Sequence, residues 1–331
     1  LEATHQAIGD TAEACLRRMI EHEQQRLASQ YGDPVDDRGE PADLVTLALG
    51  KFGGREPNYH SDLDAIFLYS ADGETRRRVG GHRPTLTNQQ FFNQLTQSVI
   101  ERINQPGPSG RLYELDSRLR DTGEEGVWAM TIQEFLDRFH QGTAPLWQLF
   151  ALCKARAVSG PHALRRKVDA AVANVLVGTH WNPSMASDLR EMRMRMQRTA
   201  RVENLKRGEG GTVDVEFVAQ ALTLRHANQT PKIIQAGTTA SLDALAKAGH
   251  LSEEQALELI SGYRTLRRVE ANLRLMNTLA RHELPDDDHS MKNLAFLMNE
   301  TDPALIEAQC HQTRLRNRAI FNDVFERLIA E

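Results

Sequence analysis

The sequence predicts an α+β protein, with a mixed sheet flanked by helices followed by an all-helical bundle. Two apolar runs of strand length, Val45 to Leu49 and Ala65 to Tyr69, and one strand-like stretch, Arg111 to Arg120, all precede Gly160. Beyond Gly160 the alternation typical of strands nearly vanishes and long helical patterns take over. We therefore expect an N-terminal helix, a catalytic sheet domain and an all-helical domain over residues 1–34, 35–160 and 161–331.

The bulk composition narrows the classes of function. The chain has 331 residues and a formal net charge of -5, which gives no general attraction to nucleic acid or to an anionic membrane. Its three cysteines, Cys15, Cys153 and Cys310, are far apart, which argues against a disulfide framework and for a reducing compartment. No apolar stretch is long enough to span a membrane and no signal peptide is visible. We expect a cytoplasmic protein without nucleic-acid or membrane partners and, since it begins at Leu1, a fragment of a longer chain.

Helical spacing of apolar residues predicts the helices. In the first half they cover Leu1 to Tyr31, Phe91 to Ile103, a segment that starts at Thr131, and Leu146 to Arg156. In the second half they cover Ala163 to Val177, Met185 to Asn204, Val213 to Asn228, Thr239 to Ala248, Ser252 to Leu279 and Asp302 to Ala330.

Between the first two strands lies a glycine-rich turn and then Ser61-Asp62-Leu63-Asp64. Side chains two residues apart on a strand point to the same face, so Asp62 and Asp64 should lie side by side. Neighbouring carboxylates repel one another unless a cation lies between them. Oxygen ligands beside a phosphate-sized turn suit Mg²⁺ or Mn²⁺ rather than zinc.

The third predicted strand carries another carboxylate, Asp116, which is unfavourable in mid-strand unless something uses it. We expect Asp116 to be a third metal ligand, adjacent in the sheet to Asp62 and Asp64. The alternative is that Asp116 pairs with Arg118 or Arg120 at a sheet edge.

Two further segments have both a structural and a functional interpretation. The glycine-rich loop Lys206 to Gly211 opens a helix, and a helix amino end suits a phosphate. The acidic residues in the next turn, Asp214 and Glu216, are equally explained by the helix dipole. The basic run Arg76 to Arg78 fits a solvated surface, with a nucleotide or partner contact as the alternative.

Four blocks of this sequence occur in the order found in one known family. The blocks LALGKFGGREPNYHSDLDAIFLY, GRLYELDSRLRDTGEEG, ALCKARAVSG and GEGGTVDVEFVAQ resemble signatures of glutamine synthetase adenylyltransferase, also called glutamate-ammonia-ligase adenylyltransferase. The first block also resembles the active site of the polymerase-β-like nucleotidyltransferase superfamily. The resemblance runs from about Leu44 to the end of the chain.

The resemblance implies roles for individual residues. The metal-binding aspartates of the family fall on Asp62, Asp64 and Asp116. The triphosphate of ATP would be bound by the glycine turn and its flanks, with residues Gly53, Gly54, Ser61, Lys51, Arg118 and Arg120.

The resemblance also implies an activity, a cofactor and partners. Family enzymes carry two similar nucleotidyltransferase halves, one adding AMP from ATP to a tyrosine of glutamine synthetase and the other removing it by phosphorolysis. This chain has room for one half and is more similar to the carboxy-terminal, adenylylating half. We expect a Mg²⁺- or Mn²⁺-dependent enzyme of nitrogen regulation that contacts glutamine synthetase and the PII signalling protein. The deadenylylating half and a non-catalytic module of the same fold are the alternatives.

Overall fold

The computed structural model describes the whole chain except residues 78–84, 109, 118–126 and 277–281. It divides into two compact units. The sheet unit comprises Glu2–Pro57 and Ser61–Val175, and the helical unit comprises Leu1, Asn58–His60 and Leu176–Glu331. The division into residues 1–34, 35–160 and 161–331 stays a prediction.

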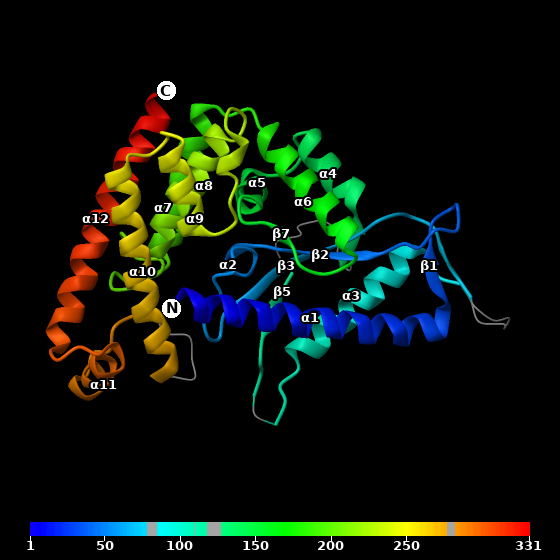
Figure 1. Cartoon of the computed structure of the whole chain (residues 1–331), viewed down its shortest axis with the longest axis horizontal. Helices are drawn as coiled ribbons and strands as arrows, with labels where there is room; N and C mark the ends of the chain where they lie inside the picture. Colours follow the sequence, from blue (N-terminus) through cyan, green and yellow to red (C-terminus); the bar gives the residue numbers. More distant parts are fainter. Residues whose placement is uncertain (78–84, 109, 118–126, 277–281) are drawn as a thin grey trace. The chain divides into compact units, whose positions relative to one another are not determined.

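The sheet unit contains the strands and the first helices (Figure 1). In chain order its elements are α1 (Glu2–Tyr31), β1 (Asp33–Val35), β2 (Leu44–Ala48), α2 (Gly50–Gly53), β3 (Asp62–Tyr69), β4 (Glu74–Arg76), α3 (Asn88–Asn104), β5 (Glu114–Asp116), β6 (Ala129–Thr131), α4 (Ile132–His140), α5 (Leu146–Leu152), β7 (Arg156–Ala157) and most of α6 (His162–Val177).

The main sheet is mixed and has the strand order β5-β3-β2-β7, with β6 also paired to β3. β2 is antiparallel to β3 and to β7. β5 and β6 both run parallel to β3, β5 beside residues 62–64 and β6 beside residues 67–69. Strands β1 and β4 form a separate antiparallel ribbon. The predicted α+β class is confirmed.

Two predicted strands are present, but the third is shorter than expected. β3 begins at Asp62, so the acidic pair lies inside the strand rather than ahead of it. Of the stretch Arg111 to Arg120, the described part is extended as a strand only over Glu114–Asp116. Strands β1, β4, β6 and β7 were not predicted, because two or three residues are too few to show a period of two.

Helices α1 and α3 pack together against the sheet. α3 starts at a capping box formed by Thr87 and Gln90. Its buried Phe92 stacks on Tyr69 of β3, with ring centroids 4.9 Å apart. The buried side chains that form this core include Leu16, Ile20 and Leu27 of α1 and Phe91, Leu95 and Val99 of α3.

A buried carboxylate, Glu23 of α1, joins the two helices. Glu23 accepts from Arg26 at 2.7 Å and pairs with Arg102 of α3 at 2.6 Å. Burial opposes ionisation, but the hydrogen bonds from Arg26 and His22 outweigh it and hold the pKa of Glu23 below its ordinary value.

The helical unit contains no strand among its described residues. Its elements are α7 (Pro183–Arg198), α8 (Thr212–His226), the short 3-10 helix η2 (Pro231–Ile233), α9 (Thr238–Lys247), α10 (Glu253–Met276), α11 (Asp288–Met298) and α12 (Pro303–Ala330). The predicted all-helical second half is confirmed. Of the helices that the structure describes, none combines the length and the apolar character needed to cross a membrane.

The glycine-rich loop before α8 is held from within the helical unit. Asp214 is fully buried and accepts hydrogen bonds from Arg193, from Arg318 at 3.0 Å and from the Gly210 N–H at 2.8 Å. Gly210 has a φ of +67°, and a β-carbon there would collide with the Arg314 carbonyl. These contacts account for the glycine and the acidic residue without a phosphate, which favours the structural interpretation.

The buried position of Asp214 predicts a large loss of stability in Asp214→Asn, since the change leaves two arginines without their shared counter-charge. Removing one member of a buried ion pair costs about 3–5 kcal/mol. Urea unfolding followed by circular dichroism measures this cost. The matched control is Asp243→Asn, which breaks an exposed pair with Lys247 and costs below about 1 kcal/mol. Equal costs in the two variants would contradict a structural role for the Asp214 network.

Candidate active site

The predicted acidic residues lie on two neighbouring strands. β3 and β5 are parallel and in register, with Asp62 opposite Glu114 and Asp64 opposite Asp116. Side chains at matching positions of neighbouring strands point to the same face. Leu63 and Leu115, which alternate with them, are buried. The structure therefore brings Asp62, Asp64 and Asp116 to one face of the sheet, as expected from the sequence.

The fourth carboxylate on this face has a partner of its own. Glu114 pairs with Arg111, three residues earlier, at 2.5 Å. Both side chains are exposed, so this pair contributes little to stability. Glu114 lies on the same strand and face as Asp116 but has no predicted role. It is therefore a suitable control position for Asp116.

The glycine turn between β2 and β3 lies directly against Asp64. Gly50, the first residue of α2, has a φ of +53°, and a β-carbon there would collide with Oδ2 of Asp64. The Leu49 N–H also donates to the Asp64 carbonyl at 2.9 Å. Only glycine combines this conformation with such a close approach. The turn and the acidic face therefore form one site.

The predicted phosphate-binding glycines have different surroundings. Gly53 is buried, and a β-carbon there would collide with the carbonyl oxygen of Lys154. Gly54 closes the turn, its N–H donating to the Gly50 carbonyl at 3.1 Å. Close packing alone explains a glycine at position 53, so a phosphate role for these two residues stays a prediction.

Two basic residues hold the turn in place, and the sequence analysis did not single them out. Arg156 of β7 donates from Nε to the Gly53 carbonyl at 3.0 Å and from Nη2 to the Phe52 carbonyl at 3.3 Å. Its guanidinium also pairs with Glu13 of α1 at 2.5 Å. Lys154, nearly fully buried, pairs with Glu56 at 2.9 Å.

The sequence feature that could have indicated these two basic residues is the ALCKAR block. There Lys154 and Arg156 are charged residues among apolar ones. Lys and Arg are rarely buried unless they are paired, so a pair of them in such a segment points to specific partners. The sequence does not show that those partners lie 98 to 143 residues earlier.

The remaining predicted nucleotide-binding residues are only partly described. Lys51 is half-buried on the turn and Ser61 is half-buried just ahead of β3. Arg118 and Arg120 lie outside the described residues, and so does their alternative pairing with Asp116. The roles of these four residues stay predictions.

The chemistry of the site fits a hard divalent cation. In the described part of the chain, no three His, Cys, Asp or Glu side chains are placed so that they could hold a metal ion as they lie. Asp62, Asp64 and Asp116 nevertheless offer only oxygen donors from a shared face, which is the donor set that Mg²⁺ and Mn²⁺ prefer. The residues fit such an ion, and their role as ligands stays a prediction.

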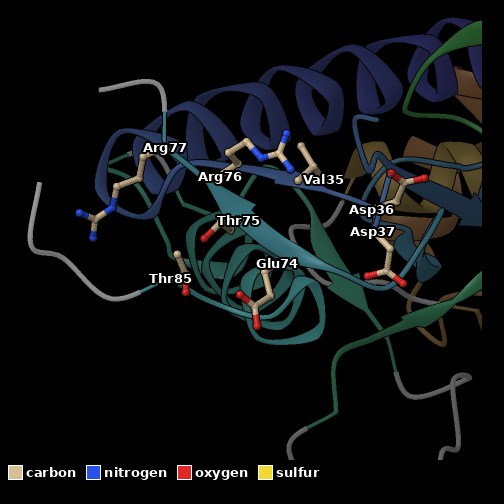
Figure 2. Close-up of a pocket in the computed structure, with 8 residues that line it drawn as sticks. All are labelled: Val35, Asp36, Asp37, Glu74, Thr75, Arg76, Arg77 and Thr85. Atoms are coloured by element: carbon tan, nitrogen blue, oxygen red, sulfur yellow. The ribbon is translucent and has the colours of Figure 1, made fainter. Parts of the chain in front are cut away.

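Cavities elsewhere in the sheet unit are lined by other residues. One hollow has a volume of about 500 Å³, and its lining includes Arg76 and Arg77 together with Asp36, Asp37 and Glu74 (Figure 2). The described lining includes none of the predicted site residues. Because its charges are mixed, this hollow has no evident preference for an anion such as a nucleotide.

A mixed sheet that presents paired acidic residues beside a glycine turn is typical of one class of enzyme, the nucleotidyltransferases. Comparison with known proteins agrees. Residues 1–171 match the family model for glutamate-ammonia ligase adenylyltransferase, and residues 184–328 match that for GlnD PII-uridylyltransferase. The chain therefore belongs to a family of nucleotidyltransferases, the glutamate-ammonia ligase adenylyltransferase family.

Two curated relatives bear the name bifunctional glutamine synthetase adenylyltransferase/adenylyl-removing enzyme. The protein of Thioalkalivibrio sulfidiphilus is 32% identical over 329 residues, which cover 98% of this chain and 33% of the relative. The protein of Shewanella woodyi is 32% identical over 279 residues, covering 83% of this chain and 29% of the relative. The chain therefore spans about a third of the length of these relatives.

The contact between Gly50 and Asp64 predicts that Gly50→Ala displaces the carboxylate and lowers nucleotidyl transfer by at least about tenfold, equivalent to about 1.4 kcal/mol. The matched control is Gly142→Ala. Gly142 also has a positive φ, +67°, but no atom lies near its missing β-carbon. Both substitutions carry the backbone cost of about 1–2 kcal/mol. Activity assays and thermal unfolding separate the two effects, and equal activity in the two variants would contradict the role of the turn.

Proposed function

We propose that this chain transfers AMP from ATP to a tyrosine of glutamine synthetase, in a reaction that depends on Mg²⁺ or Mn²⁺. The observation that carries the proposal is the register of β3 and β5, which sets Asp64 opposite Asp116 with Asp62 on the same face. Family membership supports glutamine synthetase as the protein substrate.

In this proposal Asp62, Asp64 and Asp116 would hold the divalent cation. When bound, such an ion neutralises charge on the triphosphate and activates a hydroxyl for attack. The glycine turn, Ser61 and Lys51 would bind the triphosphate, and Arg118 and Arg120 would add positive charge. The tyrosine oxygen forms a bond to the α-phosphorus, the bond to the β-phosphate oxygen breaks, and pyrophosphate leaves while the hydroxyl proton passes to solvent. Orientation and electrostatic stabilisation supply most of the rate in such reactions.

The opposite direction is the second candidate. The curated relatives are named for both adenylyl transfer and adenylyl removal, and this chain spans about a third of their length. A deadenylylating half would use the same carboxylates for phosphorolysis of adenylylated glutamine synthetase by orthophosphate. The third candidate, a non-catalytic regulatory module, is disfavoured because all three carboxylates are present on one face.

We further propose that the helical unit offers a surface to glutamine synthetase and to the PII signalling protein. The support is the match of residues 184–328 to a family model named for PII-uridylyltransferase. The proposed reaction takes place in the cytoplasm, where glutamine synthetase, ATP and reduced cysteines occur together.

The proposal predicts that Asp64→Asn and Asp116→Asn each abolish transfer, with a loss of at least about a thousandfold, because each removes a ligand charge from the cation. Glu114→Gln is the control, on the same strand and face, and should stay within about threefold of wild type. Radiolabelled AMP incorporation into glutamine synthetase measures the forward direction. Orthophosphate-dependent ADP release from adenylylated glutamine synthetase measures the reverse.

The two assays separate the candidates. Activity only in the second assay would replace adenylylation by deadenylylation as the function of this chain. Near-normal activity of Asp64→Asn or Asp116→Asn in the assay that the wild type supports would overturn the site itself.

A further inference from the structure

Strand β5 is short and, among the described residues, pairs with the sheet through β3 alone. Its three residues pair with β3, and Asp116 is its last residue. The N–H and C=O of one residue in a strand point to the same edge, and those of its neighbours point to the other. Both backbone groups of Leu115 bond to a side chain, so they lie on the edge of β5 that faces away from β3.

The side chain of Asn104, the last residue of α3, occupies that outer edge. Its Oδ1 accepts from the Leu115 N–H at 2.7 Å, and its Nδ2 donates to the Leu115 carbonyl at 3.2 Å. A carboxamide has the same donor and acceptor as a peptide group, so it can replace a neighbouring strand. Asn104 thus gives β5 hydrogen bonds on both edges, at the residue directly before Asp116.

A second asparagine of α3 does the same for the other parallel strand. Oδ1 of Asn93 accepts from the N–H groups of Trp128 and Ala129, at 2.8 and 2.9 Å. Ala129 begins β6, which pairs with β3 at residues 67–69. Asn93 and Asn104 are eleven residues apart, about three helical turns, and so lie on the same face of α3. Only Asn104 bonds the strand that carries a predicted metal ligand.

We propose that Asn104 is a positioning residue for the catalytic cation. Its hydrogen bonds to Leu115 hold β5 in the register that sets Asp116 opposite Asp64. This inference rests on the proposed function of the three carboxylates. Asn104 touches neither the cation nor the nucleotide in this proposal and acts only through the backbone of Leu115. Its loss should therefore weaken metal binding more than its effect on folding explains.

The test compares Asn104→Ala with Asn93→Ala in the full chain. Mn²⁺ binding is measured directly by electron paramagnetic resonance, without any turnover. Each variant loses two hydrogen bonds from the same helix face, so the two should lose similar thermal stability. We expect the Mn²⁺ dissociation constant to rise about tenfold in Asn104→Ala and to change less than about twofold in Asn93→Ala, where tenfold corresponds to about 1.4 kcal/mol.

A second variant keeps the test decisive if Asn104→Ala folds poorly. Asn104→Gln retains the carboxamide but extends it by one methylene, so it keeps the chemistry and alters the distance to Leu115. We expect a smaller shift of Mn²⁺ affinity in the same direction. Wild-type Mn²⁺ affinity in a folded Asn104 variant would overturn the inference.

Asp64→Asn distinguishes failure of this inference from failure of the proposed function. If Asp64→Asn loses Mn²⁺ binding while Asn104→Ala keeps it, the metal site stands and only the positioning role is wrong. If Asp64→Asn binds Mn²⁺ like the wild type, the site itself is wrong and the positioning role falls with it.

Discussion

The register between β3 and β5 is the constraint on which the rest of the site depends. Side chains on a strand alternate between faces, so a slip of one residue would exchange every position. Asp116 would then face the core and the buried Leu115 would face solvent. Burial of Leu63 and Leu115 opposes such a slip, because each leucine gains about 1.5–3 kcal/mol from leaving water. Hydrophobic burial on one face thus fixes the acidic arrangement on the other.

The central position of β3 makes this constraint effective. β2 pairs along most of one edge of β3, and β5 and β6 share the other edge. The acidic end of β3 is further confined by the glycine turn, where Gly50 leaves room for the Asp64 carboxylate. A carboxylate held in this way needs little reorganisation when a cation binds, and such preorganisation is the main electrostatic contribution of many enzymes.

Local patterns predicted much of this structure. The apolar runs gave β2 and the core of β3, helical spacing gave α1 and α3, and the acidic alternation placed Asp62 and Asp64 on one face. The short strands could not be predicted, because β6 and β7 exist only through pairing with distant partners. The anchors of the turn were missed for the same reason, since Arg156 finds the Gly53 carbonyl about a hundred residues earlier in the chain.

The loop before α8 is the converse case, in which a sequence pattern suggests a ligand site and the packing favours a structural role. In sequence, its glycines and acidic residues fit both a phosphate site and a structural loop. Only the packing distinguishes these two interpretations. Asp214 lies buried between Arg193 and Arg318, so its charge is already balanced by the protein. Sequence spacing describes which groups are close along the chain, whereas burial decides which of them remain for a ligand.

The pairing of Arg156 with Glu13 has a consequence for where this chain can be divided. Helix α1 precedes every strand, and by position alone it resembles a dispensable leader. Yet it supplies the counter-charge of the arginine that bonds the glycine turn, and through Glu23 it pairs with Arg102 of α3. Exchange of sheet units between related proteins should therefore move α1 together with the sheet, with the junction placed ahead of the helix rather than after it.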